Sequence, residues 1–233
     1  MMITSKRRVI YKVKEKKVFI LAIPTIIIII IFIIGVSVIF YNRNFKKLSR
    51  EEAKSLASKV ALLDNISCEI ITESGQDDRF RTVSDYKLKN GKLISRVDNF
   101  KIYDDSSTKY LVQIDDEEKT AYVYSDYKSE IDNFRTLICS AEKLLESNDL
   151  EYKFNEYTTV NGIKCANFSL SNQESKYNIW IDRSSGMPVK MECKYYRGGE
   201  ENGNDIYYRY QLNNVTDDIV VKPDLSDYTI IEL

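Results

Sequence analysis

The chain has 233 residues, with 34 basic and 35 acidic side chains and no histidine. The lack of histidine excludes Ser–His and Cys–His nucleophile pairs, histidine acid–base catalysis and histidine metal ligation. The formal net charge of −1 conceals an asymmetry, because residues 18–233 carry 27 bases and 34 acids, a net charge of −7. A body this acidic excludes nucleic-acid binding by bulk charge.

The first 41 residues have the pattern of a membrane anchor. Residues 1–17 hold seven bases and one acid, whereas the 24 residues 18–41 hold no charge. At about 1.5 Å per residue this segment spans about 36 Å, enough for a hydrocarbon core of about 30 Å. We expect a cytoplasmic basic arm at 1–17, a single transmembrane helix at 18–41 and an extracytoplasmic domain at 44–233, held at the cell membrane.

A cleaved secretory signal is the alternative for the same segment. Its apolar core exceeds the usual limit of about 15 residues, and no small-x-small cleavage site follows it. The pattern therefore favours an uncleaved anchor. The basic arm needs no role beyond setting the topology and attracting anionic lipid.

The four cysteines, Cys68, Cys139, Cys165 and Cys193, lie in the part expected outside the membrane. An even count there suggests disulfides, but the local patterns place Cys68 and Cys193 on apolar faces and Cys139 and Cys165 on polar ones. Free thiols are favoured, and one or two bridges are the alternative.

A short amphipathic helix is expected after the anchor. Ser49 and Glu52 form a capping box, and apolar residues then recur at helical spacing up to Leu63. From Ile66 the apolar period changes to two, which indicates strands. Asn90-Gly91 between two alternating runs predicts a hairpin.

The meander continues through further elements. Strands are expected at 100–103, 109–114 and 119–125, with turns at 104–107 and 115–118. A second helix, 128–146, places one apolar face toward the interior: Ile131, Phe134, Leu137, Ile138, Ala141, Leu144 and Leu145. Five strands follow, at 151–160, 163–170, 176–183, 189–196 and 206–212, and a turn at Asn161-Gly162 joins the first two.

These strands share one apolar face, while the other face is mostly polar. The fold class predicted is α+β: one N-terminal transmembrane helix plus an antiparallel curved sheet, an open half-barrel, covered by helices. The space between helices and sheet is a candidate apolar cavity or a filled core, since the same alternation serves both. Its lining is Phe134, Ile138, Phe168, Leu170, Tyr177, Ile179, Ile181, Val189, Met191, Tyr195, Tyr208 and Tyr210.

The sequence offers no catalytic residues, no metal site and no cofactor site. There is no CxxC, GxSxG, P-loop or GxGxxG pattern. The densest acidic clusters, 115–118 and 200–205, fall where the strand pattern requires turns, and solvated turns explain them. Calcium at 200–205 is a weaker alternative, because the EF-hand spacing is missing.

One segment resembles a known family. Residues 180–190 read Trp-Ile-Asp-Arg-Ser-Ser-Gly-Met-Pro-Val-Lys, which is similar to the strand-turn-strand of LolA/LppX-like lipoprotein carrier domains, with Trp180, Asp182, Gly186 and Pro188 as the turn motif. Gly186 can take a positive φ, and Pro188 can open the next strand. Size, composition and element order resemble the germination lipoprotein GerS-related family, although this chain has a spanning helix where that family has a lipidation cysteine.

The resemblance implies a tethered, non-catalytic binding domain of the cell or spore envelope. Members of the GerS-related type act as partners of a cortex-modifying amidase, so an envelope protein, such as a peptidoglycan amidase, is the expected partner. The alternative implied by the carrier fold is a LolA-type carrier that holds a lipid or lipoprotein acyl chain. Neither hypothesis involves nucleic acid or catalysis.

Overall fold

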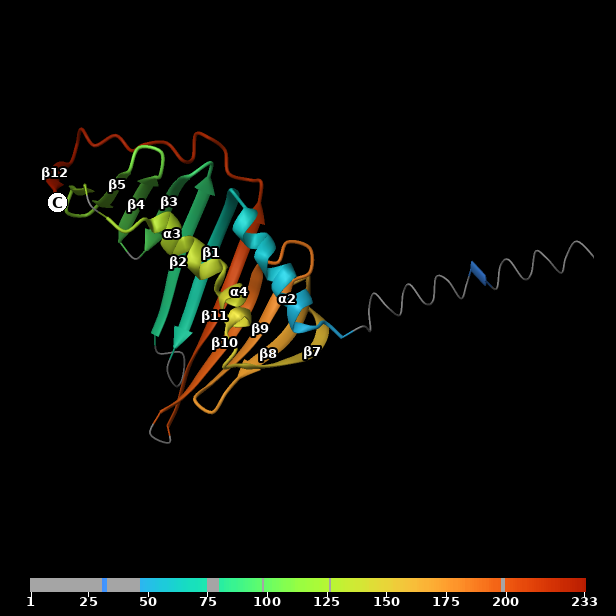
Figure 1. The fold of residues 1–233 in the computed structure, drawn as a ribbon. Coiled ribbons are helices and arrows are strands. Elements are labelled where there is room, and N and C mark those ends of the chain that lie inside the picture. Colours follow the sequence, from blue (N-terminus) through green and yellow to red (C-terminus); the bar gives the residue numbers. More distant parts are fainter. Residues whose placement is uncertain (1–30, 33–46, 75–79, 98, 126, 198–199) are drawn as a thin grey trace, which may run out of the picture. The chain divides into compact units, whose positions relative to one another are not determined.

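The computed structural model describes residues 31–32, 47–74, 80–97, 99–125, 127–197 and 200–233 (Figure 1). The predicted basic arm lies outside these residues, as does the predicted span except for Ile31 and Phe32. Among the residues described, no helix is both long and apolar enough to cross a membrane. Lys47–Leu233 form one compact unit.

The unit is built on one sheet, which has 12 strands within the described residues in the order β12-β6-β5-β4-β3-β2-β1-β11-β10-β9-β8-β7. All neighbours are antiparallel except β12 and β6, which are parallel. The strands are β1 Asn65–Ser74, β2 Phe80–Lys89, β3 Lys92–Val97, β4 Phe100–Asp105, β5 Tyr110–Asp115, β6 Thr120–Tyr124, β7 Glu151–Val160, β8 Ile163–Ser171, β9 Ser175–Asp182, β10 Pro188–Arg197, β11 Glu200–Leu212 and β12 Thr229–Glu232.

Two meanders, β1–β6 and β7–β11, join where β1 pairs with β11, with Cys68 opposite Tyr210. The two Asn-Gly turns are confirmed. Asn90 and Gly91 have φ of 50° and 72°, and Asn161 and Gly162 have φ of 50° and 83°. Positive φ at both central residues matches the right-handed twist of the flanking strands.

The helices of the compact unit are α2 Arg50–Ala57, the 3-10 helix η1 Ser58–Leu62, α3 Glu130–Ile138 and α4 Ser140–Glu146. Figure 1 shows α2, α3 and α4 on the same side of the sheet, which we call the helical face. The capping box is confirmed: the Ser49 hydroxyl accepts from the Glu52 N–H, and the Glu52 carboxylate accepts from the Ser49 N–H. The single helix predicted at 128–146 is broken at Cys139, which has φ −89° and ψ 8°.

The predicted turn at 104–107 is wrong in its first half. Asp104 and Asp105 belong to β4, and Asp104 is fully buried. Asp104 Oδ2 accepts hydrogen bonds from the Ser129 hydroxyl (2.7 Å) and the Ile131 N–H (3.1 Å), and Oδ1 accepts one from Tyr127 (3.0 Å). Burial of this acid is therefore compensated by two hydroxyl donors and by one free N–H group at the start of α3, that of Ile131.

The turn predicted at 200–205 is also wrong, because β11 begins at Glu200. Its acids are compatible with a strand since they form diagonal ion pairs with lysines of β10: Lys194 contacts Glu201 at 2.5 Å and Lys190 contacts Asp205 at 3.4 Å. Gly203 fits because its backbone lies close to β10, where an added Cβ would be 2.5 Å from the Cys193 oxygen. By contrast, the exposed turn at 116–118 is confirmed.

The last strand, β12, was not predicted. After β11 the chain follows an irregular path over 213–228, the strap, and returns to the far edge of the sheet (Figure 1). Val215 and Val220 of the strap are buried. Leu225 and Tyr228 pack against a second cluster, Tyr103, Val112, Ile114 and Ala121, on the face opposite the helices. The strap therefore covers one end of the opposite face.

The turn between β9 and β10 touches α2. Gly186 has φ +78°, and a Cβ added there would lie 2.0 Å from the Leu56 oxygen and 3.0 Å from the Leu56 carbonyl carbon. Only glycine fits, because both the backbone angle and the approach to the α2 backbone exclude a side chain.

We expect Gly186→Ala to lower the free energy of unfolding by about 3 kcal/mol, since left-handed strain and overpacking both contribute. Gly162→Ala is the matched control, because Gly162 has φ +83° but nothing lies within 4 Å of an added Cβ. That variant should lose only about 1 kcal/mol. Urea unfolding of both variants measures the difference, and equal losses would show that the turn does not press on α2.

Candidate functional site

The helical face brings together the predicted cavity residues. Strand register places Phe168 opposite Ile179, and Ile179 opposite Met191. Most of the set is buried in one cluster: Phe134, Ile138, Phe168, Leu170, Ile179, Ile181, Met191 and Tyr208, with Tyr177 and Tyr210 packed against it. Val189 is buried as well, but Tyr195 is 40% exposed. Whether this face can open into a cavity stays a prediction.

Helix α3 contributes directly to this packing. Its Phe134 ring stacks on Tyr86 of β2, with 4.7 Å between ring centroids and 19° between planes. The Tyr208 hydroxyl of β11 donates to the Leu137 oxygen at 3.4 Å. Leu137 itself, predicted to face inward, is 38% exposed, whereas Ile131, Phe134 and Ile138 form the buried face of α3. The side chains between α3 and the sheet thus pack through aromatic contacts.

Asp182 organises the turn motif. Its Oδ1 accepts from the Ser184 N–H and hydroxyl, both at 2.8 Å, and its Oδ2 accepts from the hydroxyls of Ser185 and Tyr210, both at 2.7 Å. Burial opposes ionisation, but these hydrogen bonds outweigh it and hold the pKa of Asp182 below its usual value. Asp182, Gly186 and Pro188, the first residue of β10, therefore shape the turn that meets α2.

Trp180, the fourth motif residue, points to the opposite face of the sheet. The Lys190 ammonium lies 5.3 Å from the Trp180 ring centroid and 5.2 Å from that of Tyr207. Lys190 also contacts Glu192 at 2.6 Å and Asp205 at 3.4 Å. Trp180 of the motif thus packs beside Lys190, and the ion pair of Lys190 with Asp205 joins β10 to β11.

Sequence reasoning missed the continuation of this polar ladder. Asn155 of β7 donates to Asn167 of β8 (2.8 Å), Asn167 donates to Asn178 of β9 (3.0 Å), and Asn178 donates to Glu192 of β10 (3.2 Å). Asn155 sits at the irregularity in the β7–β8 register. Because asparagine is uncommon in strands, one on each of three successive strands was the available signal.

The cysteines do not form a nucleophilic site. Burial raises the pKa of Cys68 to about 12 and those of Cys165 and Cys193 to about 11, so these thiols stay protonated at neutral pH. Cys165, predicted on a polar face, is buried, and its Sγ contacts the Ile163 oxygen at 3.4 Å.

Acidic residues do not gather into a metal site in the part of the chain that the structure describes, where no group of three or more metal-binding side chains occurs. Calcium at 200–205 therefore gains no support.

Beyond the helices the helical face stays partly uncovered. Figure 1 shows the ends of β1, β2, β10 and β11 running past α4. We call four side chains of this face the open strip: Phe80, the first residue of β2, Tyr195, near the end of β10, and the half-buried Tyr177 and Ile206, which also pack against the core. Phe80 is 70% exposed, and Tyr195 packs edge-on against Tyr177 at 6.0 Å between ring centroids. The strip is an apolar and aromatic surface that adjoins the core.

Comparison of the sequence finds no matching family model and no matching curated protein. Solved structures similar to this chain include MucB in the MucA/MucB complex of Pseudomonas aeruginosa, with 10% identity, 78% of this chain and 64% of that chain covered, and a TM-score of 0.41. The chain thus spans less than two thirds of MucB. A LolA superfamily protein from Nitrosomonas europaea has 13% identity, coverage of 73% and 97%, and a TM-score of 0.24. At these TM-scores the resemblance defines neither a family nor a function.

The Asp182 turn leads to a prediction about acid stability. Because the folded-state pKa of Asp182 is lowered, its ionised form stabilises the fold above the ordinary pKa of 3.8, and this contribution is lost as the pH falls through the lower folded value. Asp182→Asn should cost roughly 2 kcal/mol at pH 7, with the difference from wild type shrinking below about pH 4.

Urea unfolding at a series of pH values measures this difference. Asp149→Asn, at an exposed position, is the control and should leave stability unchanged at every pH. A deficit in Asp182→Asn that persists undiminished in acid would contradict the electrostatic role of Asp182.

Proposed function

We propose that the protein is a membrane-tethered, non-catalytic binding domain of the cell or spore envelope, and that it binds an envelope protein through the open strip. The observation that carries this proposal is the strip itself, where Phe80 and Tyr195 of the helical face are exposed to solvent. Tyrosine and phenylalanine supply much of the energy of protein interfaces because they bury a large area at low entropic cost.

The strip has the composition of a docking surface. Its aromatic side chains alternate with polar neighbours of the same face, including Ser74 opposite Phe80 and Asn204 opposite Cys193. Strand backbone on both sides is fixed by pairing, so a partner meets a surface that is already ordered. Ordered surfaces bind with a smaller entropic cost than flexible ones.

An enzymatic role has little support. The sequence holds no histidine, and burial raises the pKa of Cys68, Cys165 and Cys193. Asp182, the buried carboxylate of the turn, has its oxygens occupied by serine and tyrosine donors. Among the described residues these groups are therefore occupied in holding the fold together, and none of them forms a nucleophile–base pair.

The sequence resemblance to GerS-related proteins makes a cortex-modifying amidase the first partner to test, in sporulation or germination. The alternative function, a lipid or lipoprotein acyl-chain carrier, requires room between α3 and the sheet. Because Phe134 and Phe168 have no exposed surface, an acyl chain would have to displace them. The packing therefore favours the protein-binding proposal over the carrier.

The strip offers a matched pair of variants. Tyr195 and Tyr196 are neighbours on opposite faces of β10 and are 40% and 42% exposed. We expect Tyr195→Ala to weaken capture of the envelope partner by about tenfold or more, the loss of about 1.4 kcal/mol or more that is typical of an interface tyrosine. Tyr196→Ala should leave capture unchanged.

The measurement is a pull-down from envelope extracts with the full chain in mild detergent, followed by titration of the captured protein. Circular dichroism confirms that both variants are folded. Equal capture by the two variants, or recovery of no protein partner by the wild type, would refute docking through the strip.

A further inference from the structure

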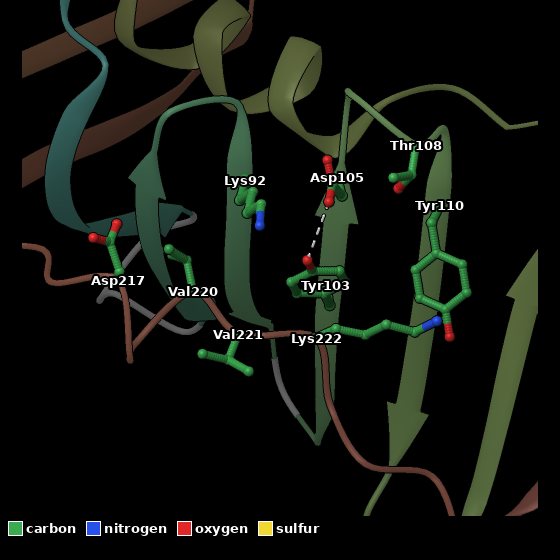
Figure 2. A pocket seen from close by; sticks show the side chains of 9 residues that line it. All are labelled: Lys92, Tyr103, Asp105, Thr108, Tyr110, Asp217, Val220, Val221 and Lys222. Atoms are coloured by element: carbon green, nitrogen blue, oxygen red, sulfur yellow. Dashed lines mark hydrogen bonds between the residues drawn. The ribbon is translucent and has the colours of Figure 1, made fainter.

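A pocket of about 430 Å³ lies between the strap and β3–β5, on the face opposite the helices (Figure 2). Its floor is Tyr103 and Asp105 of β4, and its walls include Lys92 of β3, Tyr110 of β5 and Lys222 of the strap. Figure 2 shows the two lysines extending from different elements, Lys92 from β3 and Lys222 from the strap, with the Lys222 ammonium next to the Tyr110 ring. This volume is at the small end of ligand pockets, which run from about 300 to 1,000 Å³.

The acids of the pocket already have partners. Asp105 Oδ1 accepts from the Ser107 N–H at 3.0 Å and from the Ser107 hydroxyl at 2.6 Å. Asp217, at the rim, forms an ion pair with Lys89 at 3.0 Å. The negative charge of the lining is thus largely committed to neighbouring groups.

The two lysines differ from the acids in this respect. Lys222 places its ammonium 4.0 Å from the Tyr110 ring centroid, and Lys92 acts on Asp105 through its charge. Within the described residues neither ammonium has a carboxylate within 4.0 Å, whereas Lys89, Lys190 and Lys194 each do. Two cations facing one pocket without ion pairs form an anion-binding arrangement.

The pocket also holds hydroxyl-binding groups. Tyr103 donates to Asp105 Oδ2 over a long 3.4 Å, which leaves that oxygen free to accept a shorter bond. Thr108 and Tyr110 add hydroxyls to the lining. A ligand that carries hydroxyl groups and one anionic group would therefore form hydrogen bonds with Asp105 and the hydroxyls of the lining, and ionic contacts with the two lysines.

We propose that this pocket binds a sugar-sized polyol bearing one phosphate or carboxylate, with the anion between Lys92 and Lys222 and a ligand hydroxyl on Asp105. This site is separate from the open strip, which lies on the other face. Because Lys222 and the buried Val220 belong to the strap, the ligand also ties the strap to the sheet. Binding should therefore slow amide hydrogen exchange across residues 215–228.

The test uses the full chain in non-ionic detergent and isothermal titration with glucose 6-phosphate, glucuronate and, as a neutral control, glucose. Binding of the phosphate alone or of the carboxylate alone identifies the anion, and binding of both shows that charge suffices. Absence of binding by both acids at millimolar concentration, or equal binding of glucose, would overturn the proposal.

Variants locate the site. Lys92→Gln and Lys222→Gln should each weaken binding by about tenfold or more, because each removes one charged partner of the anion. Lys164→Gln, at an exposed lysine of β8, should bind like the wild type. If Lys164→Gln loses as much affinity as Lys92→Gln, or if ligand leaves exchange at 215–228 unchanged, the ligand does not occupy this pocket.

Discussion

Helix α2 meets the sheet through one close backbone contact, the approach of Gly186 to Leu56. An added Cβ at Gly186 would lie 2.0 Å from the Leu56 oxygen, so the turn and α2 touch without any side chain between them. Asp182 keeps the turn in the required shape, and its bond from Tyr210 links the turn to β11. This contact therefore fixes the distance between α2 and the turn that joins β9 to β10.

Helix α2 is in turn joined to the end of α4 by the hydrogen bonds of Arg50. The Arg50 guanidinium donates to the oxygens of Leu145 and Leu150, both at 2.9 Å, and to that of Ser147, all at the end of α4. Free carbonyl groups at a helix end are favourable places for a cation. The Tyr152 hydroxyl donates to the Leu48 oxygen at 2.7 Å, so the start of the compact unit is tied to β7.

Both proposed binding surfaces lie where the covering of the sheet ends. On the helical face the strands run past α4 and expose the open strip. On the opposite face the strap and β3–β5 enclose the pocket that Lys92 and Lys222 line, the lysine pocket. A single sheet can carry two independent surfaces in this way because successive side chains point to opposite faces.

Much of the fold follows from local signals in the sequence. The Asn-Gly hairpins, the capping box and the alternation of β8–β11 each depend on neighbours in the chain, and the structure confirms them. The missed features depend on distant partners. Asp104 is buried because it meets the start of α3 at Ser129, 25 residues away, and Glu201 is accommodated in a strand because it forms a diagonal ion pair with Lys194. The lysine pocket needs the strap, whose position no local pattern encodes.

The most direct test of this interpretation is native mass spectrometry of residues 47–233, the compact unit, expressed and purified without detergent. If the helical face is a filled core held by the Gly186 contact, the protein mass should appear alone, even after incubation with fatty acid. A stoichiometric increase in mass matching a lipid or acyl chain would contradict that interpretation and identify the helical face as the cavity of a carrier.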